Sequence, residues 1–152
     1  MRHKEKEISD PSEMNAIIRK ATICRLGMVN GDKPYVVPMN FGYHNNTIFF
    51  HGAQKGLKFD IIKKNPNVCV EFDVAIEVIE AEKACDWSMK FQSVIVFGTA
   101  SLIDDPEEKC RALETIMAQY SDKVFDFPEK KLTATAVIKV DIARMTGKQS
   151  RL

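Results

Sequence analysis

The sequence predicts a mainly β fold, with an antiparallel sheet curled into a small barrel and helices covering its open ends. Segments with strand character follow one another through short turns, and the Asn30-Gly31 pair is typical of a β-hairpin. Strands and helices do not alternate in the regular order that produces a parallel doubly wound sheet. The chain has 152 residues, which is the usual length of one domain. We therefore expect a single domain over residues 1–152.

Two of the three predicted helices begin with the same motif. Asp10 and Asp105 are each followed by a Pro at the first helical position and by an acidic residue three positions after the Asp. This pattern combines an N-cap, a preset φ angle and a capping-box carboxylate. The third helix is expected over residues 55–64, because the residue before Pro66 avoids the helical region.

Six strands are expected from runs of β-branched and aromatic residues between turns. They cover residues 23–29, 35–43, 47–51, 68–74, 91–103 and 135–142, and the first three should follow one another as hairpins. The fourth strand either extends through residue 79 or is followed by a loop to that residue. Pro38 lies within the second strand, where it cannot donate to a ladder, so it indicates an edge, a bulge or an opening in the backbone pairing. The polar, Pro-containing residues 122–131 are expected to form a loop.

Composition excludes several classes of protein. Lys and Arg total 22 against 21 for Asp and Glu, so the chain lacks the basic excess of a dedicated nucleic-acid binder. No apolar run has the length of a membrane span or a signal peptide, which predicts a cytoplasmic protein with no membrane partner. The four cysteines form no CxxC pair and are expected to be free thiols. The three histidines show no metal-ligand spacing, so no metal site is expected.

Three segments could bind a ligand. The strand around Pro38 could offer free backbone groups to a planar heterocycle, or it could be an ordinary kinked edge strand. Residues 51–58 join a strand to a helix and contain two glycines, Lys55 and Lys58, which suits a phosphate at a helix N-terminus; two solvated lysines are the alternative. Residues 85–93 contain the single Trp87, which could stack on a ring, line a dimer interface or pack beside the core.

Taken in order, several segments carry a family resemblance: residues 24–27, 34–43, 50–58, 65–68, 87–90 and 93–94. The sequence in these segments resembles the pyridoxamine 5'-phosphate oxidase-like flavoproteins, and within them the nitroimidazole-resistance (Nim-type) proteins. The resemblance covers nearly the whole chain, from residue 23 to residue 148. It implies a six-stranded antiparallel split β-barrel that forms a homodimer, with FMN in two clefts at the subunit interface.

The same resemblance implies a set of cofactor-binding residues. They are Pro38, Met39, Asn40 and Phe41 along the flavin ring, His51, Gly52 and Ala53 beside the ribityl chain and ring, Lys58 at the phosphate, Ser93 reaching the flavin from one subunit, and Trp87 and Lys148 in matching segments. By resemblance, His51 is also the candidate catalytic residue, with a substrate-contacting or proton-transferring role.

The function that this resemblance implies is an FMN-dependent oxidoreductase. A nicotinamide or another donor would reduce the flavin, which would then reduce a small-molecule electron acceptor such as a nitro compound. The alternatives are a non-enzymatic flavin-binding or storage protein, and a haem-binding split-barrel protein with His51 as ligand. The chain departs from the vitamin-synthesising oxidases, which carry an Arg-x-His motif near the C-terminus, because it has no His after His51. We therefore expect a shared fold and FMN site with a different substrate.

Overall fold

The computed structural model describes residues 4–150, so His3 and the two ends of the expected 1–152 domain lie outside the described residues. The helices are α1 (Pro11–Lys20), α2 (Leu57–Lys64), α3 (Pro106–Ala118) and α4 (Glu129–Ala134), with 3-10 turns η1 (Lys4–Lys6) and η2 (Ala84–Asp86). The strands are β1 (Glu7–Ile8), β2 (Cys24–Asn30), β3 (Lys33–Met39), β4 (Gly42–His44), β5 (Thr47–Ala53), β6 (Asn67–Ile79), β7 (Ser88–Ile103) and β8 (Thr135–Ser150). The mainly β class is confirmed, but the described residues form eight strands where six were expected, because the expected strand 35–43 is divided into β3 and β4 and the short β1 is added.

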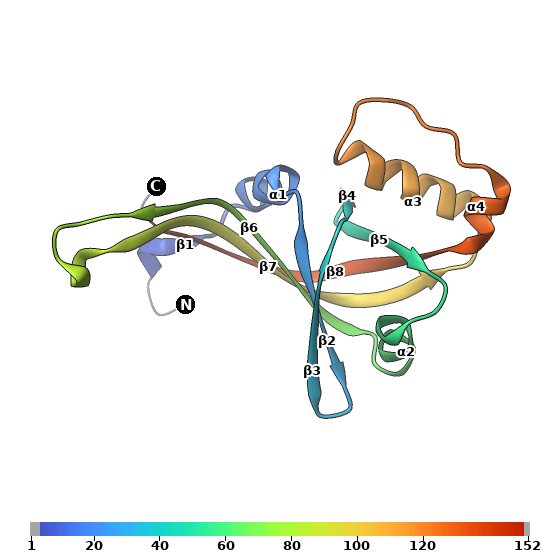
Figure 1. Cartoon of the computed structure of the whole chain (residues 1–152), viewed down its shortest axis with the longest axis horizontal. Coiled ribbons are helices and arrows are strands. Elements are labelled where there is room, and N and C mark those ends of the chain that lie inside the picture. The colour runs from blue at the N-terminus through green and yellow to red at the C-terminus, as the bar shows by residue number, and fades with distance from the viewer. Residues whose placement is uncertain (1–3, 151–152) are drawn as a thin grey trace.

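The strands form one antiparallel sheet in the order β3-β2-β6-β7-β8-β5-β4, with β1 paired to β8 (Figure 1). Strands β3 and β4 lie at opposite ends of this order, yet only Asn40 and Phe41 separate them in the chain. Three peptide links span at most about 11 Å, so the two edges of the sheet must approach each other at this corner. Among the described residues the edges do not pair elsewhere, which produces a split barrel.

This topology corrects part of the expected hairpin succession of three strands. Both hairpins form, with Cys24 opposite Met39 and His44 opposite Thr47, but the second one uses only the short β4, and β5 continues along β8 and not along β3. The expected strand 35–43 is broken because Phe41 turns into the core, where it is fully buried. Its ring meets the ring of Phe72 edge-on, with 4.9 Å between centroids. The two resulting pieces, β3 and β4, then belong to opposite edges of the sheet.

The sheet has one face in the main core and another that is largely uncovered. On β7, Val94 and Val96 are completely buried, whereas Ile95 and Phe97 are 36% and 37% exposed. This follows from the alternation of side chains along a strand. Helices α1 and α2 cover the buried face, and α3 packs on the opposite face near β4 and β5 (Figure 1). We call the uncovered face of β2, β6, β7 and β8, which carries Ile95 and Phe97, the outer face.

Strands β7 and β8 are longer than the sequence predicts, β6 takes the extended form of its two expected alternatives, and the three strands form an arm that projects from the body (Figure 1). Strand β6 continues past an irregularity after Val74, where Ala75 has a φ of 55°, and reaches Ile79. Apolar side chains here are exposed, including Ile76 at 59% and Val78 at 53%. This part of β6 therefore lies outside the main core, and its apolar side chains are at the surface.

The helix boundaries follow the predicted signals closely. The carboxylates of Asp10 and Asp105 each accept a backbone N–H at 2.8 Å, so both N-caps are confirmed. Helix α2 begins at Leu57, two residues later than expected, because Gly56 occupies the N-cap with a φ of 147°. The expected loop 122–131 ends early, since α4 begins immediately after Pro128. In the described residues, no helix is both long and apolar enough to cross a bilayer.

Candidate functional site

The ammonium group of Lys58 lies against the backbone of Gly52, where β5 leads into α2. A Cβ atom on Gly52 would come within 3.2 Å of Lys58 Nζ and 3.4 Å of the buried Phe59 ring. Lys58 Nζ also lies 5.0 Å from the centroid of that ring. No carboxylate in the described part of the chain pairs with Lys58. The structure thus brings the predicted residues Gly52 and Lys58 together, and no acidic side chain among the described residues neutralises the charge of the Lys58 ammonium.

The first turn of α2 adds backbone donors to this corner. No side chain caps the helix at Gly56, whose carbonyl accepts from the amides of Phe59 and Asp60. The amides of Leu57 and Lys58 have no acceptor within residues 4–150. Unpaired N–H groups at a helix start favour an anion, and the ammonium of Lys58 adds a full charge. We call Gly52, Gly56, Leu57 and Lys58 the anion corner.

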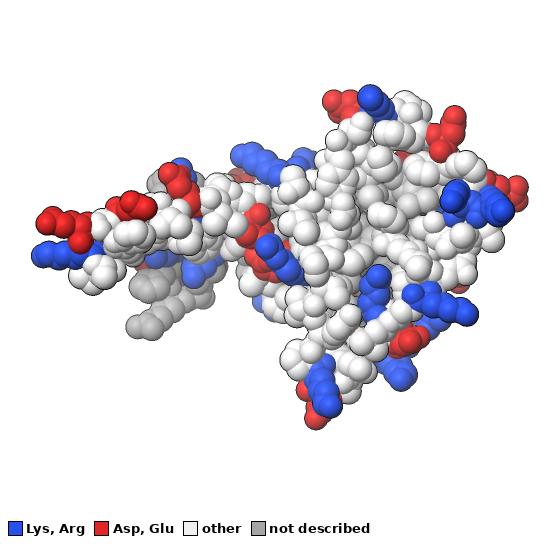
Figure 2. All heavy atoms as spheres, viewed as in Figure 1, with Lys and Arg blue, Asp and Glu red and all other residues white. Residues whose placement is uncertain are grey.

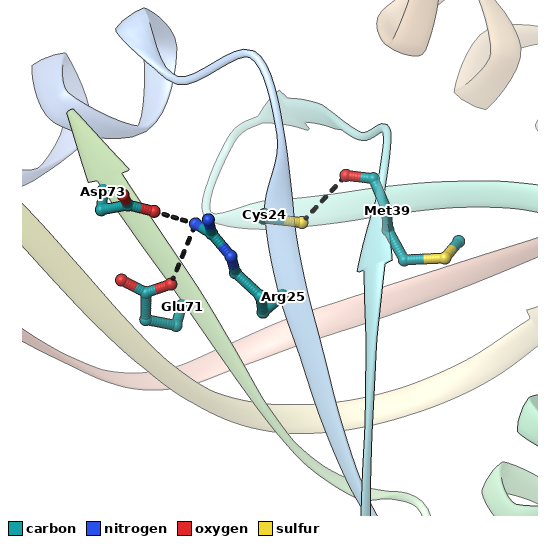
Figure 3. Close-up of polar contacts among 5 residues, drawn as sticks. All are labelled: Cys24, Arg25, Met39, Glu71 and Asp73. Carbon is teal, nitrogen blue, oxygen red and sulfur yellow. Dashed lines mark hydrogen bonds and ion pairs between the residues drawn. The ribbon is translucent and has the colours of Figure 1, made fainter.

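The end of β3 offers fewer free backbone groups than its sequence indicates. Pro38 pairs with Arg25 on the edge strand and is exposed, as is Asn40. Met39 packs against the core, and its carbonyl accepts from the Cys24 thiol at 3.5 Å (Figure 3). The N–H of Phe41 donates to the hydroxyl of Tyr120 at 3.0 Å and is therefore occupied. Pro38 and Asn40 remain accessible at the surface.

Cys24 is a structural thiol. Burial raises its pKa to about 12, so the thiol stays protonated at neutral pH. The neighbouring Arg25 opposes this shift, but burial dominates. Cys24 is therefore unsuited to nucleophilic chemistry, which requires a thiolate.

Ser93 and Lys148 lie side by side on the outer face. Ser93 is opposite Asp73 on β6 and opposite Lys148 on β8, so the three side chains form one row across the sheet. Lys148 Nζ lies 5.7 Å from the ring centroid of Phe91. An open cavity of about 350 Å³ here is lined by Arg25, Glu71, Asp73, Ile76, Met89, Phe91 and Ser93.

An ion-pair cluster in this cavity was not assigned from the sequence. Arg25 Nη1 contacts Asp73 and lies 3.4 Å from Glu71 Oε2 (Figure 3). Burial raises the pKa of Glu71, while the charge of Arg25 opposes that shift. Glu71 and Asp73 alternate with the buried Val70 and Phe72. This alternation of apolar and acidic residues in the sequence could have predicted that both carboxylates lie on the outer face.

His51 and Trp87 occupy two other places. His51 is opposite Val137 on β8 and lines a cavity beneath α3 and α4, on the other side of β5 from Gly52 and Lys58. Trp87 lies at the far end of the arm, where it is 49% exposed and donates from Nε1 to the carbonyl of Ala81 at 2.7 Å. Ala53, the last residue of β5, is exposed. Within one chain, the predicted site residues therefore lie in several separate places and do not form a single cluster.

Charge is distributed without a broad basic surface on the face drawn in Figure 2. Acidic and basic side chains lie along the arm and around the periphery of the body, and the centre of that face is largely uncharged (Figure 2). Within residues 4–150 no group of three or more His, Cys, Asp or Glu side chains has the geometry to hold a metal ion. The anion corner is thus a local feature of a chain whose formal net charge is +1.

The fold and sequence match proteins of known structure. A crystal structure of a candidate 5-nitroimidazole antibiotic resistance protein from Bacteroides thetaiotaomicron is 35% identical, with a TM-score of 0.86 over 94% of this chain and 86% of that chain. The flavocytochrome Anf3 from Azotobacter vinelandii is 22% identical, with a TM-score of 0.87 over 100% of this chain and 72% of that one. An FAD and haem binding protein from Mycobacterium smegmatis is 17% identical, with a TM-score of 0.87 over 97% and 74%.

The last two similarities establish the fold alone, because their identities are low. No curated protein sequence matches the chain. The sequence model of the pyridoxamine 5'-phosphate oxidase family matches residues 10–149, which is almost the entire described chain. The chain therefore belongs to the pyridoxamine 5'-phosphate oxidase family of split-barrel proteins.

Proposed function

We propose that the protein binds FMN and acts as an oxidoreductase that passes electrons to a small-molecule acceptor. The observation that carries the proposal is the anion corner, where Lys58 has no acidic partner among the described residues and lies against Gly52. A helix start with free amides and an ammonium suits one phosphate group. Family membership supports a flavin as the molecule that carries this phosphate.

The residues present fit FMN. Lys58 and the free amides at the start of α2 would hold the phosphate. Gly52 has no side chain, and this leaves the space that the Lys58 ammonium occupies. The exposed Pro38 and Asn40 would lie along the flavin ring. When bound, FMN supplies reversible acceptance and donation of a hydride. The roles of Met39 and Phe41 would be indirect, because both side chains pack in the core.

A second copy of the chain would complete the site. Ser93 and Lys148 lie on the outer face, whereas Lys58 lies at the β5–α2 corner, so we propose that Ser93 reaches the flavin from the other subunit of a homodimer. The outer face is suited to such contact because Ile95 and Phe97 are exposed there at 36% and 37%, and Val36 on the adjoining edge strand β3, in register with Phe97 across the sheet, is exposed at 60%. An isologous dimer would cover the same apolar surface on both copies.

His51 is the proposed substrate-contacting or proton-transferring residue. Its side chain lines a cavity, and no hydrogen bond to another described residue occupies its ring nitrogens. A His51→Ala variant that turns over at the wild-type rate would remove this role. The two remaining predicted residues are exposed, Ala53 at the end of β5 and Trp87 at the far end of the arm. Each would contact the cofactor only if the cofactor reached that part of the surface.

A non-enzymatic flavin carrier is the second candidate, because the anion corner would serve binding equally well. A haem-binding protein with His51 as the ligand is the third candidate, and the spectrum described below distinguishes it from the other two.

A visible spectrum of the purified protein tests the cofactor directly. Two broad flavin bands are expected, or quenching of FMN fluorescence when FMN is added to colourless protein. A sharp Soret band would instead indicate haem, and neither colour nor quenching would overturn the flavin proposal. Anaerobic bleaching by NADH, NADPH or another donor, followed by reoxidation with a nitro compound, then separates an oxidoreductase from a carrier.

A further inference from the structure

A cavity beneath α3 and α4 is separate from the anion corner. It measures about 210 Å³ and is lined by His51, Leu113, Ile116, Met117, Phe127, Lys131, Leu132 and Thr135. These residues come from β5, α3, the α3–α4 connection, α4 and β8. The cavity adjoins a small apolar cluster in which Ile103 and Val137 of the sheet pack against α3.

Strand β5 separates the cavity beneath α3 and α4 from the anion corner. Neighbouring residues on a strand point to opposite faces, so His51 faces α3 and α4 while Gly52 faces Lys58 and Phe59. The position of Val137 supports this assignment, because it is opposite His51 and is buried in the cluster beneath α3. A molecule in this cavity would therefore not occupy the anion corner.

The chemistry of the walls is specific. Leu113, Ile116, Met117, Phe127 and Leu132 make the walls mostly apolar, and no acidic residue is among the described residues that line the cavity. The polar groups are the imidazole of His51, the ammonium of Lys131 and the hydroxyl of Thr135. The hydroxyl already donates to the carbonyl of Lys131 at 2.8 Å. Within residues 4–150, neither His51 nor Lys131 has an acidic partner.

The cavity has room for a small ring. An enclosed apolar protein cavity of about 150 Å³ is sufficient to hold benzene. The cavity here measures about 210 Å³ and is open to solvent at its polar side, where His51 and Lys131 are exposed. Apolar walls select a ring or a branched chain, and two basic side chains without acidic partners select a negative charge.

We propose that this cavity binds a small apolar monocarboxylate of about the size of benzoate, with its apolar end against Leu113, Ile116 and Phe127 and its carboxylate at His51 and Lys131. The proposal rests on the proposed function in one respect, because His51 is also the residue proposed there to contact substrate; the cavity includes no residue of the anion corner. A neighbouring cavity of about 260 Å³ shares Met117 and Phe127 as walls and lies under residues 121–125, so longer acids would extend in that direction.

Benzoate is the probe, and benzamide is its uncharged counterpart with the same ring. In calorimetric titrations of the full chain, benzoate should bind at least about tenfold more tightly than benzamide, because only benzoate carries a negative charge that pairs with the ammonium of Lys131. The difference should persist when the protein is saturated with FMN. Equal affinity for the two probes, no benzoate binding, or loss of benzoate binding in the presence of FMN would each overturn the proposal.

Matched variants identify the site. Lys131→Gln should weaken benzoate binding about tenfold and leave benzamide unchanged. The adjacent Lys130 lines a different cavity with Gln54 and Thr133, so Lys130→Gln should bind benzoate as the wild type does. Backbone ¹⁵N chemical shifts of the wild type should change in α3, α4 and β5 on titration with benzoate. Changes confined to the start of α2, or an equal loss in both lysine variants, would contradict the assignment.

Discussion

The hydroxyl of Tyr120 links the end of α3 to the corner of the split barrel. It accepts a hydrogen bond from the N–H of Phe41 at 3.0 Å and donates to the carbonyl of Thr22 at 3.1 Å. Phe41 lies in the two-residue connection between β3 and β4, and Thr22 immediately precedes the start of β2 at residue 24. One side chain thus holds three segments at the corner where the two edges of the sheet approach each other.

Tyr120→Phe should lower the free energy of unfolding by about 1–2 kcal/mol. Each of the two hydrogen bonds contributes about 0.5–1.5 kcal/mol, and the partial exposure of Tyr120 lets water replace part of the loss. Urea unfolding of the variant and the wild type measures the difference. Tyr35→Phe is the control, because no hydrogen bond of the Tyr35 hydroxyl occurs within the described residues. An equal change in both variants would contradict a specific role for Tyr120.

Gly42→Ala should destabilise the protein by about 2–4 kcal/mol. A Cβ atom on Gly42 would lie 2.6 Å from the backbone nitrogen of Ile116, and a helix backbone cannot yield as a flexible side chain can. Thermal unfolding followed by circular dichroism measures the loss. Gly31→Ala is the comparison, because Gly31 has a φ of 67° but no atom within 4 Å of its Cβ position. Its cost should be the smaller one, about 1 kcal/mol, from backbone strain alone.

Lys58→Gln should weaken FMN binding about tenfold or more and leave riboflavin binding nearly unchanged, because only FMN carries the phosphate. Fluorescence quenching of each flavin measures both affinities. Lys63→Gln removes the same charge from the last turn of α2, away from the anion corner, and should have little effect on either flavin. An equal loss of both flavins in Lys58→Gln would show that the residue does not act on the phosphate.

Phe97→Glu should shift the protein from dimer to monomer at micromolar concentration. The Phe97 ring lies on the outer face, 4.1 Å from the guanidinium carbon of Arg144, and a carboxylate in its place would be costly to bury between two copies. Sedimentation velocity measures the oligomeric state. Val124→Glu is the control, since Val124 is 97% exposed on the α3–α4 connection. A monomeric wild type, or dissociation of both variants, would refute the proposed interface.

Glu71→Gln should change the pH dependence of stability. Burial raises the pKa of Glu71 above its ordinary value of 4.5, with Arg25 opposing, so the folded state binds this proton more tightly than the unfolded state. Its contribution is present in full below the unfolded-state pKa and is lost as pH rises through the higher folded-state pKa. The variant should therefore gain stability relative to the wild type as pH rises above about 4.5.

Urea midpoints between pH 3.5 and 7 measure this effect. Glu77→Gln on the same strand removes one negative charge from a side chain that is 68% exposed, and it controls for the change in net charge. A difference between wild type and Glu71→Gln that stays constant over this range, or that falls with rising pH, would contradict the raised pKa.

The local signals in the sequence predicted individual elements well. The Asp-Pro motifs at Asp10 and Asp105 placed two helices, and the Asn30-Gly31 pair placed the hairpin of β2 and β3. These signals act within a few residues, so the chain carries them irrespective of the rest of the fold. The family resemblance was confirmed by the match over residues 10–149. The assignment of individual residues to FMN stays a prediction.

What the sequence by itself determined was the mainly β class, the capped helices and the presence of a cationic segment before α2. Only the tertiary structure decided that β5 pairs with β8, because the burial of Phe41 breaks the second strand and sends its two pieces to opposite edges of the sheet. It also decided that His51 and Lys58 lie on opposite sides of β5, since side-chain direction depends on pairing across the sheet. The Arg25–Asp73 pair joins residues 48 positions apart, which no local pattern could have connected.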